Sequence, residues 1–402
     1  MALPIGLRAF RHADFRRFFV AQLVAQVGSW MQTVAQSWLV LQLTSSPLLL
    51  GLIGTLQFGP ILLFSIVSGA LADRLPKRRL LIVTQTVLGC QALALGALVY
   101  SGHVEYWHVA VLATGVGLAN VLDAPARQSF VAEMVGRADL SSALSLNSAS
   151  FNAARIVGPS IGGLLIARFG VAPAFVCNGV GFAIAIAAML SLRIRGLPQP
   201  PTGAGVVEEI LTGIRYVWRT PEMVLALGLT FMVSFCVFNF TVYVPLLVRD
   251  VLELGAEGFG FLMASLGVGA VSGALTLGTL GARRPPRALM FAAAALACGG
   301  LLGLSLVPSF WPAVAALFVT GFFGIMLVVS CNTTMQLAST DALRGRVMSI
   351  YTLVWGGVFP IGAFLVGAMS ERWGVQRALL TNGTIGLTGV AALLGWWRLR
   401  AR

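Results

Sequence analysis

The chain alternates between long apolar stretches and short clusters of charged and polar residues. Each apolar stretch has about 20 residues, the length that a helix needs to cross a hydrocarbon core of about 30 Å. Backbone groups in lipid need partners within their own segment, so we predict that every stretch is a helix. The twelve predicted spans are 18–42, 48–72, 80–100, 107–126, 143–166, 171–192, 222–247, 259–281, 288–307, 311–336, 347–369 and 376–397.

Composition supports a chain that is dissolved in a bilayer. Hydrophobic residues make up 57% of the 402 positions and charged residues only 10%, whereas soluble domains carry about 25% charged residues. The five cysteines fall inside predicted spans without metal-ligand spacing, and the three histidines do not cluster. We interpret the cysteines as packing residues, and we expect no metal, no other cofactor and no enzymatic activity.

The distribution of charge predicts the orientation. The net charge of +13 could indicate nucleic acid, but the bases follow the spans. Most of the 27 Lys and Arg residues lie in alternate loops and at the termini, and the exceptions are Arg155 inside a span and Arg168, Arg249, Arg372 and Arg377 in the opposite loops. By the positive-inside rule, we predict cytoplasmic termini in the inner membrane, basic loops facing anionic lipid, and no nucleic-acid partner.

The two halves of the chain resemble each other at a constant offset. The matched pairs are Gly158 and Gly362, Gly163 and Gly367, Arg168 and Arg372, Gly170 and Gly374, and Asn178 and Asn382. A parallel repeat of six helices is the plan of transporters with a substrate site between the halves. We predict an all-α membrane protein with twelve transmembrane helices in two pseudo-symmetric six-helix bundles, 1–193 and 222–402, joined by a cytoplasmic linker, 194–221.

The linker contains one stretch with helical periodicity. Its apolar residues share one face, and they are Val207, Ile210, Leu211, Ile214, Val217 and Trp218. Such a helix lies either on the membrane surface or against the bundle, and the pattern does not decide between them. A glycine-rich stretch at 267–273, "GVGAVSG", has no strand before it, so we interpret Gly269 and Gly273 as helix-packing residues and not as a dinucleotide loop.

Four strings carry a resemblance to a known family. They are "GALADRLPKRR" at 69–79, "DAPARQSFVAEMV", "ALSLNSASFNAARIVGPSIGG" and "ALRGRVMSIYTLVWGGVFPIG". The chain resembles the major facilitator superfamily over nearly its whole length, and it is similar to the branch that holds the enterobactin exporter and macrolide efflux proteins. It departs from the family at Pro76, where glycine is usual, at Lys77, where arginine is common, and at Ala113, where the fourth helix usually has arginine.

The resemblance implies a gate in the loop between the second and third spans. Its residues would be Gly69, Asp73, Arg74, Lys77 and Arg78, with Asp73 meeting the start of the eleventh span near 345–347. The alternative is a loop that only fixes topology. The family motif of the fifth span, associated there with antiport, is partly present and comprises Gly158, Pro159, Gly162 and Gly163. Glycines there permit close helix contact.

Polar residues inside spans are the candidate transport site. At about 1.5 Å per residue, Arg155 lies about 18 Å into its span, where an unshielded charge costs on the order of 3 kcal/mol or more. We expect it to face a central cavity, with Asp123 as its charged partner, in a substrate or coupling role. A purely structural ion pair is the alternative.

A polar stripe marks the first span. Its residues, spaced by four and three, are Gln22, Gln26, Ser29, Thr33 and Gln36, and Asn147, Asn152 and Asn239 would extend the polar lining. They either line a cavity or make hydrogen bonds between helices.

The function that follows is a monomeric secondary transporter. We expect export of a small amphipathic compound, a drug or a siderophore, by alternating access and driven by a proton gradient, with Asp123 as the coupling acid. The alternatives are an importer of a small metabolite or anion that uses Arg155 as the anion contact, and a membrane scaffold or sensor that transports nothing.

Overall fold

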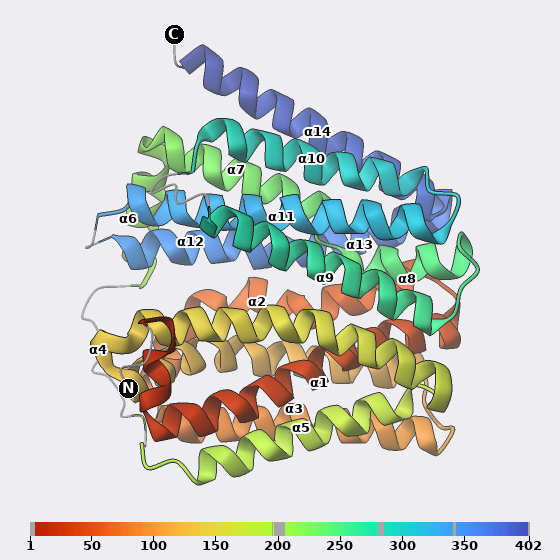
Figure 1. Ribbon diagram of the computed structural model, residues 1–402, viewed down its shortest axis with the longest axis horizontal. Coiled ribbons are helices and arrows are strands. Elements are labelled where there is room, and N and C mark those ends of the chain that lie inside the picture. The colour runs from red at the N-terminus through yellow and green to blue at the C-terminus, as the bar shows by residue number, and fades with distance from the viewer. Residues whose placement is uncertain (1–4, 195, 197–205, 280–284, 341–342, 401–402) are drawn as a thin grey trace. The chain divides into compact units, whose positions relative to one another are not determined.

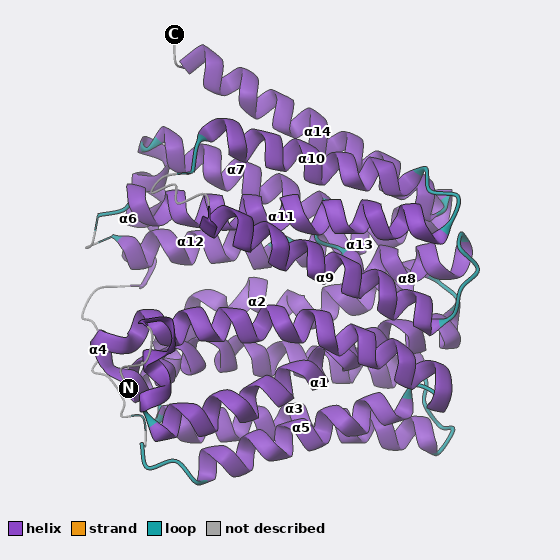
Figure 2. Ribbon diagram, viewed as in Figure 1, coloured by secondary structure: helices purple, strands orange, loops and turns teal. Residues whose placement is uncertain are grey.

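The structure is a computed structural model of the 402-residue chain. It describes residues 5–194, 196, 206–279, 285–340 and 343–400, and the side chains at 5, 65–70, 72, 73, 137 and 206–210 are outside the description. The described residues form helices joined by short loops (Figure 2). They divide into two compact units, and unit 1 comprises Met1–Ser45 and Gly59–Thr202, while unit 2 comprises Ser46–Phe58 and Gly203–Arg402.

The helices follow the predicted spans. In chain order they are η1 (Ile5–Arg11), α1 (Ala13–Thr44), α2 (Pro47–Arg74), α3 (Lys77–Tyr100), α4 (Tyr106–Phe169), α5 (Ala172–Leu190), α6 (Val206–Arg219), α7 (Pro221–Cys236), α8 (Phe240–Asp250), α9 (Ala256–Thr279), α10 (Arg287–Ser305), α11 (Phe310–Ala338), α12 (Arg344–Gly357), α13 (Phe359–Trp373) and α14 (Val375–Arg400).

Ten helical segments of the described chain are long and apolar enough to cross a membrane. Each of the twelve predicted ranges overlaps a helix, but the ranges 18–42 in α1 and 143–166 in α4 are not among the ten. Both carry many polar side chains, which lowers their hydropathy. The nearly all-helical membrane fold is therefore established, and the count of twelve spans stays a prediction.

Three predicted boundaries look different in the structure. The fourth and fifth spans are two arms of α4, which is interrupted only at Gly136, with φ 68° and ψ 174°. The seventh span is broken at residues 237–239, between α7 and α8, and the eleventh is broken at Val358, between α12 and α13. Gly136 adopts its positive φ without a clash because it has no side chain, so it allows the chain to turn between the two arms of α4.

Unit 1 is built from α1, α3, α4 and α5, which pack side by side with η1 against α4 (Figure 1). One apolar core gathers buried side chains from η1 and four α-helices, among them Phe15 and Phe18 of α1, Leu81 of α3, Phe130 of α4 and Met189 of α5. The rings of Phe18 and Phe130 meet edge to face with centroids 5.9 Å apart. Edge-to-face aromatic packing adds to the stability gained from burial.

Unit 2 holds α6–α14 together with the first half of α2. In that half, Thr55 Oγ1 donates a 2.9 Å hydrogen bond to the carbonyl oxygen of Pro360 in α13. Glu371, near the end of α13, accepts hydrogen bonds from Ser46 Oγ at 2.9 Å and from the Leu48 N–H at 3.1 Å. A carboxylate at the start of a helix satisfies free N–H groups and is favoured by the helix dipole.

The predicted packing of the glycine-rich stretch is visible in α9. A Cβ placed on Gly269 or Gly273 would collide with the backbone carbonyl oxygens of Phe318 and Phe322 in α11. Glycine at these positions therefore allows the two helix backbones to touch, which is how small residues join helices in lipid.

Two matched glycines of the internal repeat have the same conformation. Gly170 caps α4 with φ 78°, and Gly374 caps α13 with φ 80°. Both follow an aromatic residue in the similar strings "ARFG" and "ERWG". A positive φ is strained for any residue with a side chain, so the turn explains why glycine stands at both places.

Candidate functional site

The polar stripe of α1 reaches the neighbouring helices of unit 1. Gln22 and Gln26 are both buried. Gln22 Oε1 accepts a 3.1 Å hydrogen bond from Gln85 Nε2 of α3, and Gln26 Oε1 accepts a 2.9 Å hydrogen bond from Ser150 Oγ of α4. These two glutamines join α1 to two other helices, as the interhelical alternative anticipates.

The other stripe residues are bonded within α1 or are buried. Ser29 Oγ donates to the Ala25 carbonyl oxygen at 2.9 Å, and Thr33 Oγ1 donates to the Ser29 carbonyl oxygen at 2.9 Å. Both side chains are half-buried, and Gln36 is buried. Hydroxyl groups that donate to their own helix keep oxygen lone pairs that other groups can use.

A second set of polar residues was not identified from the sequence. Gln32 Nε2 donates to Gln91 Oε1 of α3 at 3.0 Å, and Asn178 Nδ2 of α5 donates to Gln32 Oε1 at 2.6 Å. Asn178 Oδ1 also accepts from Ser29 Oγ at 3.5 Å. The sequence signal that could have identified them is a polar residue inside an apolar span. Gln32 lies one residue from the stripe, and Gln91 lies within the third predicted span.

Asp123 of α4 is buried. Its Oδ2 is 3.0 Å from Arg127 Nη2, one turn later in the same helix. Its Oδ1 accepts a 2.8 Å hydrogen bond from Thr84 Oγ1 of α3. Arg127 and Thr84 therefore hold the carboxylate, and its expected pair with Arg155 stays a prediction. Residues four apart in a helix are neighbours, which explains this choice of partner.

Arg155 lies in the second arm of α4 and is 7% exposed. Its guanidinium is 5.8 Å from the ring centroid of Trp30 in α1. The Trp30 ring also meets Phe151 edge to face, with centroids 5.8 Å apart. The base is therefore covered by an aromatic face, an arrangement that stabilises a cation in a medium of low dielectric.

The glycine motif beside Arg155 brings α4 against α1. A Cβ on Gly158 would lie 2.6 Å from Trp30 Cβ, and a Cβ on Gly162 would lie 3.1 Å from Met31 Cγ. Pro159 and Gly163 are buried in the same arm. This close contact positions the Trp30 ring next to Arg155.

The basic loop after α2 is held by unit 1 itself. Arg74 is exposed, whereas Lys77 is completely buried and pairs with Glu133 of α4. The Lys77 N–H donates to the Gly196 carbonyl oxygen at 3.1 Å. A buried, paired lysine ties α3 to α4, because breaking such a pair would leave a charge without a partner.

The remaining gate residues are only partly described. Arg78 Nη2 donates to the Leu190 carbonyl oxygen at the end of α5 at 2.6 Å. Gly69 and Asp73 lie in α2, but the surroundings of these two residues are outside the described part of the chain. The contact expected for Asp73 therefore stays a prediction.

The three predicted asparagines lie in α4 and at the break between α7 and α8. Asn147 is half-buried in α4, and Asn152 Nδ2 donates to the Ser148 carbonyl oxygen at 2.8 Å. Asn239 lies in unit 2, at the break between α7 and α8, and donates to the Phe235 carbonyl oxygen at 2.8 Å. A Cβ on Gly362 would be 2.6 Å from Asn239 Nδ2, so α13 passes directly over this asparagine.

Several buried amide atoms have no hydrogen-bond partner among the described residues. They are Gln85 Oε1, Gln91 Nε2 and Asn239 Oδ1. A buried polar atom without a partner costs about 1–3 kcal/mol. Water or a bound polar molecule would satisfy these atoms, so in each unit these residues offer neutral hydrogen bonding. No group of His, Cys, Asp and Glu able to hold a metal ion occurs among the described residues.

Comparison with known proteins covers almost the whole chain. The profile of a family described as a transmembrane secretion effector matches residues 5–401. The multidrug efflux pump Tap of Mycolicibacterium fortuitum is 28% identical over 378 residues, which are 90% of this chain and 90% of that protein. The enterobactin exporter EntS of Shigella boydii serotype 4 is 28% identical over 389 residues, 95% of this chain and 91% of the relative. The staphyloferrin A transporter of Staphylococcus aureus is 24% identical over 390 residues, 91% and 92% of the two chains.

Solved structures share the fold at lower identity. A bacterial homologue of the human lysosomal transporter Spinster, inward-facing and unoccupied, matches with a TM-score of 0.76 and 15% identity over 98% of this chain and 97% of its own. A POT family transporter in complex with 5-aminolevulinic acid matches with a TM-score of 0.79 and 11% identity over 96% of each chain. At these identities the likeness concerns the fold alone.

Proposed function

Because the chain belongs to the transmembrane secretion effector family of major facilitator transporters, we propose that it exports a small amphipathic compound, a drug or a siderophore, by proton-driven antiport. The chain is a membrane transporter and not an enzyme. The single observation that carries the proposal is the match of residues 5–401 to this family. The names of the efflux and siderophore relatives support the direction and the substrate class.

The location that goes with this function is the inner membrane, with both termini in the cytoplasm. The arginine-rich loops support this orientation, because bases accumulate on the cytoplasmic side of membrane proteins. We take the protein to be a monomer of twelve spans, with bundles 1–193 and 222–402 and linker 194–221, that exposes its substrate site alternately to the two sides.

Asp123 is the residue that we assign to proton coupling. Among the Asp and Glu side chains that the structure describes, it is the only buried one. A proton taken up by this carboxylate would neutralise it and release Arg127 from the 3.0 Å ion pair. Loss of that pair changes the charge between α3 and α4, where Thr84 also holds the acid. Proton relays in membrane proteins usually consist of titratable side chains inside the spans.

Substrate contact is assigned to the polar and aromatic residues of unit 1 and, within unit 2, separately to Asn239. Gln22, Gln26, Thr33 and Gln36 offer neutral hydrogen-bonding groups, and Asn147 and Asn152 add amides in α4. The Arg155 guanidinium over the Trp30 ring adds a positive charge beside an apolar face. Such a mixture suits an amphipathic compound, because each part of the compound finds a matching environment.

Opening and closing of the site is assigned to the loop motif. In this proposal Gly69, Asp73, Arg74, Lys77 and Arg78 form a cytoplasmic latch, and the burial of Lys77 against Glu133 anchors its second half in unit 1. Gly158, Pro159, Gly162 and Gly163 keep α4 against α1 while the latch changes state.

The decisive test of direction is transport into membrane vesicles of both orientations. Inverted vesicles with an acidic lumen would accumulate a fluorescent dye or siderophore, because export from the cytoplasm points into their lumen. An importer would load right-side-out vesicles instead, and a scaffold would load neither. Accumulation only in right-side-out vesicles would contradict the proposal, and a resistance profile of an overproducing strain would select the compounds to test.

A further inference from the structure

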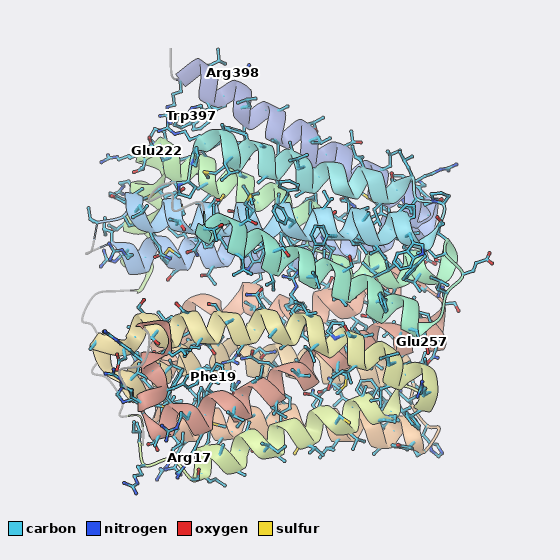
Figure 3. The ribbon with its side chains drawn as sticks, viewed as in Figure 1. Arg17, Phe19, Glu222, Glu257, Trp397 and Arg398 are labelled. Carbon is cyan, nitrogen blue, oxygen red and sulfur yellow. The ribbon has the colours of Figure 1, made fainter. Side chains whose placement is uncertain are left out.

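Aromatic and basic residues gather in unit 2 where the end of α6, the start of α7 and the end of α14 meet. A groove of about 480 Å³ is lined there by Trp218, Val224, Trp396, Leu399 and Arg400. Both α6 and α14 pack against α7, so the groove is formed by helices in direct contact. Figure 3 shows Trp397 and Arg398 at the end of α14 and Glu222 at the start of α7.

One face of α6 is packed and the opposite face is open. Tyr216 Oη donates to the Ala338 carbonyl oxygen of α11 at 3.0 Å, and Val217 is buried. On the other side, Leu211, Ile214 and Trp218 form an exposed apolar stripe with helical spacing. The helix therefore packs on other helices of unit 2 with one face, and its exposed apolar stripe leaves the membrane-surface location a prediction. An apolar stripe beside bases is typical of a helix at the membrane interface.

The charge of the groove is positive. Glu222 is already paired with Arg287, whose Nη2 is 3.1 Å from Glu222 Oε1, and the Arg287 guanidinium lies 4.4 Å from the centroid of Trp397. Arg400 lies over Trp396 at 5.3 Å. Because Glu222 is neutralised, Arg400 leaves a positive charge in the groove, and the exposed Arg219 directly follows the lining residue Trp218 in the chain.

We propose that this groove binds the headgroup of an anionic phospholipid. Arg400 and Arg219 would contact the phosphate, because guanidinium groups bind phosphate oxygens with paired hydrogen bonds. Trp218 and Trp396 would lie at the boundary between headgroups and acyl chains, where indole rings are enriched. Assignment of this lipid to the cytoplasmic leaflet rests on the orientation given under Proposed function. The positive charge selects an anionic headgroup over a zwitterionic one.

The test is lipid binding to the full-length protein in detergent, measured by native mass spectrometry. Phosphatidylglycerol and phosphatidylcholine with identical acyl chains are titrated separately. The wild type should bind phosphatidylglycerol more tightly, and Arg219→Gln with Arg400→Gln should weaken that binding by about fivefold for each arginine removed. Binding of phosphatidylcholine should not change.

Arg377→Gln is the matched control, because Arg377 is exposed near the opposite end of α14. Equal binding of the two lipids by the wild type, or full phosphatidylglycerol binding by the double variant, would overturn the proposal. If the double variant does not fold, Arg400→Gln alone gives the same comparison. Binding in detergent does not require transport, so failure here leaves the export proposal intact, and failure of export leaves the lipid result intact.

Discussion

Thr84 Oγ1 lies 2.8 Å from Asp123 Oδ1, so a hydroxyl of α3 holds the buried acid of α4. A hydrogen bond to a charged group is worth about 1.5–3 kcal/mol. Thr84→Val keeps the shape of the side chain and removes the donor. We expect this variant to unfold at a lower temperature in detergent and to lose export several-fold in inverted vesicles.

Thr84→Ser is the control for that prediction, because it keeps the hydroxyl and removes only a methyl group. It should retain most of the export and most of the thermal stability. Wild-type behaviour of Thr84→Val would show that the hydrogen bond has no part in the site.

The link between Gln32 and Asn178 offers a second prediction. Asn178 Nδ2 donates to Gln32 Oε1 at 2.6 Å and joins α5 to α1. Hydrogen bonds between membrane helices couple by about 0.6–1.7 kcal/mol in double-mutant cycles. A cycle of Gln32→Ala and Asn178→Ala, measured by unfolding in detergent, should give a coupling in that range.

A control cycle combines Gln32→Ala with Asn382→Ala. Asn382 bonds only to the Ala378 carbonyl oxygen of its own helix among the contacts described, so no coupling is expected. Additive effects in the first cycle would mean that the Gln32–Asn178 bond does not stabilise unit 1.

Close packing of α9 on α11 makes a third prediction. A methyl group at Gly273 would overlap the Phe322 carbonyl oxygen, whereas a Cβ at Gly278 of the same helix meets nothing within 4 Å. Overpacking typically costs about 1–3 kcal/mol. Gly273→Ala should therefore lower the unfolding temperature and the amount of protein in the membrane, and Gly278→Ala should leave both nearly unchanged. Equal effects of the two substitutions would contradict the packing explanation.

Arg155 provides a fourth prediction, which separates a substrate role from a structural one. Arg155→Gln removes the charge over the Trp30 ring. If the guanidinium contacts substrate, the variant should be present at wild-type abundance and lose export of anionic compounds more than of cationic ones. Resistance profiles and immunoblots measure the two quantities. A parallel fall of abundance and of export for every compound would indicate a structural role of Arg155 instead.

The helices could be predicted from the sequence because lipid imposes a simple rule, about 20 apolar residues for each span. The rule locates α3 and α11 closely, since charged or polar residues bound both. It does not reveal Gly136, because a turn between two helical arms depends on one backbone conformation. It also gave no reason for the first half of α2 to pack on α13, a contact that depends on tertiary structure.

The polar residues of the site could be found only in part. The spacing of Gln22 and Gln26 marks one face of α1, and both are indeed buried. Gln32 was missed because its partners, Gln91 and Asn178, come from α3 and α5. The spacing of polar residues within one helix does not tell which residues of other helices face it. The spacing of Asp123 and Arg127 already allowed their ion pair, because residues four apart in a helix are neighbours.

Coupling to protons is the central claim and can be measured directly. The purified protein is reconstituted in liposomes that contain a pH-sensitive dye, and a gradient of exported compound is imposed without any other ion gradient. We predict that the wild type and Asp250→Asn, an exposed control, move protons opposite to the compound, and that Asp123→Asn does not. Proton movement by Asp123→Asn at the wild-type rate, or none by the wild type while it transports the compound, would contradict the account.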